Sequence, residues 1–469
     1  MKKALISKKS LFPVLAIILV LAIAVTGASF AMAQGAYTPS DLSRRAEGSE
    51  PQVFGPTAPS ESGGEIAASG EGGPASADQA GLDGSSVPEA APPEIDDPIS
   101  DAELQDLQAI ASQKGISLQA AIDRYAWNDN FALAVAKIRE ASPATFARAE
   151  IVDAGHAWVG FAGPAPEAAR EMIDAFGNNH SGVSVSVRID LGFTEVELER
   201  AIEAVHFAVL ETPEVCDAST SFDFATGQIT TSIVLEGTAS DSVLDDLEAI
   251  AAKNLTDATR PDILNSITVS VVRSNHNVTG GVESNAEHLG GETLSTCTSG
   301  FVTKNSSGVR GISTAGHCND SQTDDGSSLT YKEEYVGTHG DFQWHTGPQN
   351  EPDDFYSGND SSTEVNRRDV SSVGTPVVGQ SLCRNGRTSY KGCQEVRKLN
   401  VCNGDACNLV EMGEHLSADG DSGGPVFWGN TAYGLHQGWI YDPIWPFDRQ
   451  VFSRADRIDD ALGISIATN

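Results

Sequence analysis

The cysteines of this chain are concentrated in its C-terminal part, which limits how the chain can be divided into folded regions. Six of the seven lie after residue 277, and only Cys216 lies before it. An odd number of cysteines in an exported protein leaves one thiol without a partner, whereas a cut near residue 277 leaves an even six in the C-terminal piece. We expect Cys216 to be a buried small hydrophobic residue rather than a reactive thiol.

Residues 1–33 have the pattern of an export signal. Four lysines precede the apolar run Leu11–Val25, and Ala31-Met32-Ala33 supplies the small residues that a signal peptidase requires. The apolar run falls short of the ~20 residues that span a bilayer. We therefore predict cleavage after Ala33 and an extracellular product with no stable membrane anchor. Outside the cell, disulfides can form.

Residues 34–98 consist largely of glycine, serine, proline, alanine and glutamate, which predicts a disordered linker. The whole chain carries a formal net charge of −35. Such a chain has no excess of cations to neutralise phosphates, which by default rules out a nucleic-acid binder, and the same charge argues against adhesion to anionic membranes. Solubility is the simplest role for this charge.

Residues 99–276 are expected to form an α+β region. Ser100 and Glu103 have the spacing of a capping box, a helix is expected to end at Gly115, and a second helical stretch covers 118–138. A strand-turn-strand-helix-strand pattern then occurs twice, with helices on one face of each sheet. The expected strands are 149–152, 157–162, 183–191, 220–224, 229–236 and 267–273, and the helices are 166–176, a capped helix beginning at Thr194, and 241–253. We find no metal-ligand cluster or catalytic motif here.

In residues 277–469 the sequence pattern changes to short apolar segments separated by glycine and serine turns, which predicts an all-β fold. Two motifs in this region contain candidate catalytic residues. The sequence S-T-A-G-H-C contains His317, and G-D-S-G-G-P contains Gly420 and Ser422. A serine nucleophile needs a nearby base and backbone N–H donors aimed at the forming oxyanion. We predict that Ser422 attacks, that His317 transfers the proton, and that the amides of Gly420 and Ser422 form the oxyanion hole.

These motifs resemble the chymotrypsin-fold serine endopeptidases, and more closely their bacterial streptogrisin and alpha-lytic endopeptidase branch. The resemblance covers nearly all of 277–469 and implies two six-stranded antiparallel β-barrels. It also implies that 99–276 is a pro-region that acts as an intramolecular chaperone and inhibitor and is removed by cleavage near Asn277. Four further segments carry the resemblance: NVTGG from Asn277, CRNGRTSYKGC from Cys383, GLHQG from Gly434, and the terminal RADRIDDALGISI.

Proximity in the sequence and the resemblance together predict three disulfides. The predicted pairs are Cys297–Cys318, Cys383–Cys393 and Cys402–Cys407.

The third member of the catalytic triad must lie between His317 and Ser422 and hold the correct tautomer of the histidine. Asp341, in GDFQWH, resembles the aspartate of the family and is our prediction. Asp353 and Asp354 are the alternatives, although an acidic, solvated loop is the simpler interpretation of both.

The resemblance places the specificity pocket beside the strand that contains His436, Gln437, Gly438 and Trp439. His436 matches a pocket histidine of glutamyl-specific relatives, and Trp439 stands where a large side chain narrows the pocket. The alternative is that His436 simply packs inside the barrel.

The sequence thus predicts a secreted, monomeric serine endopeptidase that cleaves proteins or peptides through an acyl-enzyme, without metal or cofactor. Two alternatives stay open. The chain could be a catalytically impaired protein that binds ligands through the same cleft, or 99–276 could be a lasting binding or inhibitory domain.

Overall fold

The computed structural model describes residues 99–236, 242–260, 263, 267–273, 289–324, 326–347, 351–358, 366–440 and 448–469. The predicted export signal, the linker and the cleavage position near Asn277 lie outside these residues. Within the described ranges, no helix combines the length and the apolar character that crossing a membrane requires.

The described chain begins with three helices, α1 (Asp101–Lys114), α2 (Leu118–Tyr125) and α3 (Asn128–Ala141). The predicted capping box of Ser100 and Glu103 is present, and Gly115 ends α1 in the left-handed conformation, with φ 64°. The single helical stretch expected over 118–138 is instead broken in two. At the break, the buried Trp127 indole donates a hydrogen bond to the carbonyl of Ala154 at 3.0 Å, a tertiary contact that helical periodicity does not reveal.

The first strand-helix unit is a three-stranded sheet whose order is β1-β2-β3. Helices α3 and α4 share one core with this sheet, in which Phe131, Phe161 and Ile173 are buried. The connection through α4 makes β3 parallel to β2, as the strand-helix-strand pattern predicts. The elements are β1 (Phe146–Asp153), β2 (His156–Phe161), α4 (Glu167–Asn179) and β3 (Ser184–Arg188).

The second unit repeats this arrangement, and its helix α5 begins with the predicted capping box of Thr194 and Glu197. Val205, Ile229 and Leu247 pack between the helices and the sheet. The prediction for Cys216 is wrong, because its side chain is exposed. The pairing of β4 with β5 shifts in register around this residue, so the simple in-out alternation of a strand is lost there. The elements are α5 (Glu195–Leu210), β4 (Val215–Asp223), β5 (Gln228–Leu235), α6 (Ser242–Ala258) and β6 (Thr268–Arg273).

The C-terminal region is all-β, with two principal sheets, and has the chymotrypsin-like architecture that we predicted. The first has the order β11-β12-β8-β7-β22, so five strands of the described chain join in it, where the prediction was six. Two short ladders, β9–β10 and β13–β14, pair separately. The elements are β7 (Val302–Asn305), β8 (Arg310–Thr314), β9 (Thr323–Asp324), β10 (Ser327–Ser328), β11 (Thr330–Gly337), β12 (Gly340–Thr346), β13 (Asp354–Tyr356), β14 (Arg367–Asp369) and β22 (Ile464–Ile466).

The second sheet of this region is a closed barrel. Its strands follow the order β16-β19-β20-β21-β18-β17, and a pairing between β16 and β17 closes the ring, as predicted for a six-stranded barrel. Val410, Phe427 and Phe452 are among the residues that fill it. The elements are β15 (Ser372–Val373), which adds to β20, β16 (Ser381–Arg384), β17 (Gly392–Asn403), β18 (Ala406–Glu414), β19 (Pro425–Trp428), β20 (Thr431–Ile440), β21 (Arg449–Arg454), a 3₁₀ turn (Ala455–Arg457) and α7 (Ile458–Leu462).

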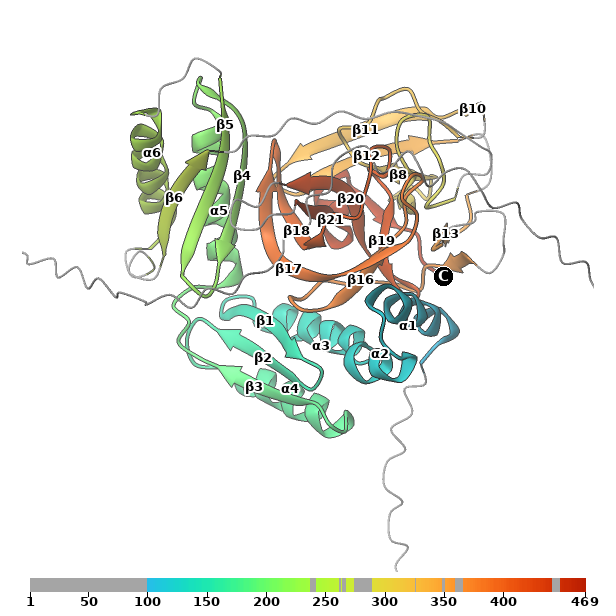
Figure 1. Cartoon of the computed structure of the whole chain (residues 1–469), viewed down its shortest axis with the longest axis horizontal. Coiled ribbons are helices and arrows are strands. Elements are labelled where there is room, and N and C mark those ends of the chain that lie inside the picture. The colour runs from blue at the N-terminus through green and yellow to red at the C-terminus, as the bar shows by residue number, and fades with distance from the viewer. Residues whose placement is uncertain are drawn as a thin grey trace, which may run out of the picture. The chain divides into compact units, whose positions relative to one another are not determined.

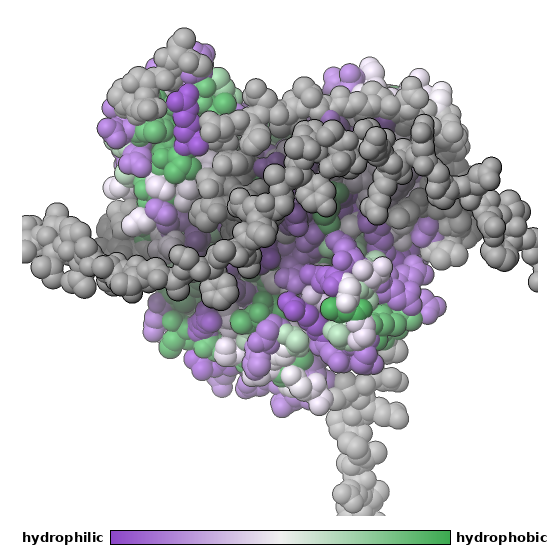
Figure 2. Space-filling model, in the orientation of Figure 1, coloured by the Kyte–Doolittle hydropathy of each residue, from purple (hydrophilic) through white to green (hydrophobic). Residues whose placement is uncertain are grey.

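The barrel and the second α+β unit share a continuous sheet. Strand β4 pairs antiparallel with β17, with Cys402 opposite Thr220 and Asn403 opposite Ser219, so that β4, β5 and β6 extend the sheet beyond the barrel (Figure 1). Figure 2 shows that hydrophilic side chains predominate on the visible face of the described residues, with smaller apolar patches among them.

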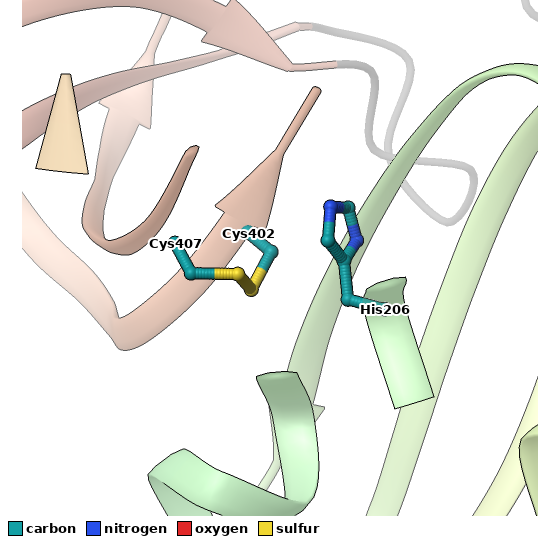
Figure 3. Close-up of side chains that lie close together, drawn as sticks. All are labelled: His206, Cys402 and Cys407. Carbon is teal, nitrogen blue, oxygen red and sulfur yellow. A yellow bond between two sulfur atoms is a disulfide. The ribbon is translucent and has the colours of Figure 1, made fainter. Parts of the chain in front are cut away.

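His206 of α5 lies buried at this junction, facing the Cys402–Cys407 disulfide (Figure 3). Its Nε2 donates to the carbonyl of Gly404 at 2.7 Å. Because a carbonyl only accepts, Nδ1 carries no proton and accepts from the Thr220 hydroxyl at 2.9 Å. The imidazole and the two sulfurs are close enough for one ion, but metal binding by cysteine requires thiolates, and the disulfide consumes both. This cluster is therefore a structural junction.

Candidate active site

The structure joins His317 and Asp341 in a two-point contact. His317 follows β8 and Asp341 lies in β12, the strand paired with β8. The Nδ1 of His317 is 2.5 Å from Oδ2 of Asp341, and the backbone N–H of His317 donates to Oδ1 at 2.9 Å. The carboxylate therefore fixes both the ring and the main chain. It also fixes the tautomer, because Nδ1–H faces the carboxylate and Nε2 is left to accept a proton.

Electrostatics at this pair favour a basic imidazole. Burial by itself would lower the pKa of His317, but the charge and hydrogen bond of Asp341 outweigh it and hold that pKa above the ordinary 6.5. The side chain of Asp341 is only 1% exposed, so its attraction for the imidazolium is little screened by water.

Several neighbours hold Asp341 and the segment after His317 in place. The amide of Asp341 donates to the Ser453 hydroxyl at 3.0 Å, and Gln343 donates from Nε2 to the carbonyl of Cys318 at 3.1 Å. A Cβ on Gly316 would lie 2.7 Å from Oδ1 of Asp341, so glycine permits this close approach. These roles of Ser453 and Gln343 were not predicted, because long-range partners leave no local sequence signal.

The alternative aspartates have other partners. Asp354 pairs with Arg367 at 2.6 Å, and Asp353 pairs with Arg310. Neither contacts His317, so in this geometry Asp341 is the carboxylate that can orient it.

Ser422 lies in the loop before β19, and this loop packs against the segment that leads into His317. The backbone N–H of Thr298 donates to the carbonyl of Ser422 at 2.8 Å. A Cβ on Gly423 would fall 2.1 Å from the Thr314 hydroxyl, so glycine is required for this contact, and its φ of 87° also favours glycine. The Ser422 hydroxyl donates to the carbonyl of Gln437 at 3.3 Å rather than to His317. Catalytic hydrogen bonds are often completed only when substrate binds.

The loop leaves two amides available on either side of Asp421. The N–H of Asp421 donates to the carbonyl of Ala418 at 3.1 Å, whereas within the described residues the N–H groups of Gly420 and Ser422 meet no acceptor. Gly420 has φ 95°, a conformation that favours glycine. Two free donors beside a hydroxyl are the arrangement that an oxyanion requires.

The buried Asp421 anchors this loop, a role that was not predicted from the sequence. Its carboxylate accepts from the amides of Ala418 at 2.9 Å, Thr388 at 2.8 Å and Ser389 at 3.1 Å. The buried Arg384 faces it at 3.4 Å. The signal was present in the sequence, since both residues belong to the motifs quoted above.

The predicted pocket residues occupy different environments along β20. His436 is only 2% exposed, and burial lowers its pKa well below 6.5, which keeps its imidazole neutral. The Trp439 ring stacks on that of His415, with centroids 4.4 Å apart, while Gln437 and Gly438 are partly exposed. The burial of His436 favours the interpretation that it packs inside the barrel.

The three predicted disulfides are confirmed. Cys297–Cys318 links the loop before β7 to the segment after His317, and Cys383–Cys393 joins paired positions of β16 and β17. Cys402–Cys407 closes the β17–β18 hairpin.

The closed barrel, the companion sheet and the His317–Asp341 pair together have the arrangement of a chymotrypsin-like fold. Serine protease 1 of Streptomyces fradiae is 32% identical over 168 residues, which make up 32% of this chain and 45% of that protein. The chain thus spans less than half of the relative. No family profile matches the chain.

Solved structures similar to this chain include the Nocardiopsis protease, with 21% identity, a TM-score of 0.34, and coverage of 39% of this chain and 100% of that one. A glutamic acid-specific serine protease has 24% identity, a TM-score of 0.33, and coverage of 38% and 100%. The Streptomyces relative supports the resemblance to bacterial serine proteases that the motifs predict.

Proposed function

We propose that this chain is the precursor of a secreted serine endopeptidase, acting as a monomer through Ser422, His317 and Asp341. One observation carries the proposal. The Asp341 carboxylate holds both the ring and the backbone of His317, and in the nearby loop the amides of Gly420 and Ser422 meet no acceptor among the described residues.

The chemistry follows from this arrangement. The Ser422 hydroxyl adds to the scissile carbonyl as His317 takes its proton at Nε2, and the N–H groups of Gly420 and Ser422 stabilise the oxyanion. His317 then gives the proton to the leaving amine, which yields the acyl-enzyme. Water, activated by the same imidazole, releases the acid and restores the serine. Asp341 stabilises the imidazolium that forms in both steps.

Labelling of the secreted protein with a fluorophosphonate tests this proposal. We expect the parent protein to be labelled and Ser422→Ala to remain unlabelled. Ser417→Ala is a matched control, because this serine lies in the same segment and is buried. Absence of label in the folded parent protein would favour the alternative, a binding protein that uses the same cleft without catalysis.

We also propose that residues 1–33 direct export, that cleavage near Asn277 releases the enzyme, and that 99–276 serve as its folding assistant and inhibitor. The pairing of β4 with β17 and the burial of His206 support an intimate association of the two regions. The N-terminal sequence and the mass of the secreted protein test this. A start near Asn277 is expected, whereas an intact product would favour a lasting domain.

The association should depend on pH through His206. Burial lowers its pKa to about 4, so between pH 4 and 6.5 the unfolded chain binds the extra proton, and the stability due to His206 rises with pH. Asp405, on the facing turn, opposes this shift. Glu203 of the same helix titrates in the opposite sense, because burial and Glu199 raise its pKa to about 7. A further titratable group of this unit is Asp217 on β4, and burial raises its pKa.

A comparison of two chains isolates the effect of His206 from that of Glu203. In a Ser422→Ala background, which should keep the chain intact, urea unfolding is measured with and without His206→Gln. The loss of unfolding free energy caused by His206→Gln should be about 1–3 kcal/mol larger above pH 6.5 than near pH 4. An equal loss at both pH values would contradict a buried, neutral histidine at this junction.

A preference for glutamate before the scissile bond is the finer hypothesis for the pocket beside His436. Peptides with glutamate, phenylalanine, leucine or arginine at that position measure it through kcat/KM. Faster cleavage after glutamate that is lost in His436→Leu would support the hypothesis. Uniform rates would reject it and agree with a histidine that only packs in the barrel.

A further inference from the structure

Asp106 of α1 is fully buried and lies in a site built to hold a carboxylate. One of its oxygens, Oδ2, accepts from Nη1 of Arg368 at 2.9 Å and from the backbone N–H of Gly429 at 2.7 Å. The other, Oδ1, accepts from Nη2 of Arg368 at 3.0 Å and from Nζ of Lys391 at 2.5 Å. The Arg368 guanidinium therefore binds the carboxylate through two parallel hydrogen bonds. The Lys391 ammonium and the Gly429 amide donate the other two.

The groups that surround this carboxylate all come from the C-terminal region. Arg368 lies on β14, Lys391 lies between β16 and β17, and Gly429 forms the turn between β19 and β20. Helix α1 contacts β17 and β19 (Figure 1). The carboxylate thus comes from the N-terminal end of the described chain, and its receptor comes from the barrel region.

The receptor has internal contacts that do not require α1. Arg368 also donates from Nη1 to the carbonyl of Gly429 at 3.0 Å. The guanidinium and the Lys391 ammonium both lie over the ring of Phe427, at 5.4 Å and 5.6 Å from its centroid. These contacts orient the two cations on a rigid, buried ring, so the site is largely organised before a carboxylate arrives.

This site is separate from the proposed catalytic residues. Gly429 follows the end of β19 that lies away from the loop of Ser422. If 99–276 are cleaved off and leave, Asp106 leaves with them, while Arg368, Lys391 and the amide of Gly429 remain on the barrel region. This matched set of charged and backbone donors should then attract another carboxylate.

We propose that Arg368, Lys391 and the amide of Gly429 form a carboxylate-binding exosite, which Asp106 fills in the precursor and an aspartate on an acidic helical peptide fills in the mature enzyme. The second half of this proposal rests on the maturation proposed above. The exosite would let the enzyme hold acidic segments, including the released pro-region, away from the catalytic cleft.

The first experiment uses the secreted mature enzyme and a synthetic peptide of residues 99–116, with binding measured by calorimetry. Asp106→Asn in the peptide should weaken binding by about tenfold or more, because an amide cannot neutralise both cations. Asp101→Asn is the matched control, since it removes the same charge from an exposed position of the same helix and should change affinity little. Equal weakening by both substitutions, or no binding of the parent peptide, would overturn the proposal.

The second experiment uses the full chain and does not depend on maturation. In a Ser422→Ala background, Asp106→Ala should lower the thermal midpoint, and sodium formate should restore part of it relative to sodium chloride at equal ionic strength. Asp101→Ala and the parent chain should show no formate-specific gain. If Asp106→Ala does not fold, Asp106→Gly and refolding yield with and without formate provide the same comparison. Absence of a formate effect on either would overturn the exosite.

Fluorophosphonate labelling of the mature enzyme and of the parent chain, both with Ser422 intact, separates this proposal from the proposed function. A labelled, mature enzyme that does not bind the peptide contradicts the exosite and leaves the protease assignment standing. If the parent chain, with Ser422 intact, remains unlabelled while formate still restores the thermal midpoint of Asp106→Ala, the protease assignment is contradicted and the site around Asp106 is supported.

Discussion

Substitution of His317 by alanine should lower kcat for peptide hydrolysis by about 10⁶-fold, because the Ser422 hydroxyl then has no base to take its proton. KM should change little, since His317 acts on the proton and not on the bound peptide. The measurement is single-turnover hydrolysis of a peptide by enzyme that has been matured in trans and then repurified.

The parent enzyme supplies the companion measurement. Asp341 holds the pKa of His317 above 6.5, so kcat/KM should fall as the pH drops through that value and the imidazole becomes protonated. The residual kcat/KM of His317→Ala should not show this fall at acidic pH. Retention of activity within about tenfold in His317→Ala would contradict the proposed mechanism.

Substitution of Asp341 by asparagine should lower kcat by about 10⁴-fold while leaving the shape of the site nearly unchanged. The asparagine amide would donate to Nδ1 of His317, which places the imidazole proton on Nε2 and removes the acceptor that Ser422 needs. The contacts of the carboxylate with the ring and the backbone of His317 are the basis for this expectation.

Asp354→Asn is the matched control for this second prediction. It makes the same chemical change at the alternative aspartate, whose carboxylate pairs with Arg367, so activity should change by less than about twofold. Similar losses in both variants would show that Asp341 has no special role.

Much of the fold was predictable because its signals are local. Capping boxes at Ser100 and Thr194 and the in-out alternation of the strands depend on residues only a few positions apart. The break at Trp127 and the exposure of Cys216 were not predictable in this way. The first depends on a hydrogen bond to a distant carbonyl, and the second depends on a register shift between two strands.

In the candidate site, too, the residues with local sequence signals were predictable and those with distant partners were not. His317 and Ser422 stand in short motifs, and Asp341 followed from resemblance to a family. The supporting groups escaped prediction, because their partners are far away in the sequence. In the active site, Ser453 reaches Asp341 across 112 positions, and in the separate site around Asp106, Arg368 reaches that aspartate across 262. Periodicity and spacing carry no information about such pairs.

The junction of β4 with β17 has a consequence for the solution behaviour of the processed enzyme. Only two residue pairs join these strands, and the barrel closes on itself through β16 and β17. At this strand junction, departure of 99–276 would therefore uncover only a short stretch of unpaired strand edge, at Cys402 and Asn403. So short a strand edge is a poor template for the addition of another strand, which lowers the risk of edge-to-edge association at this position of the processed enzyme.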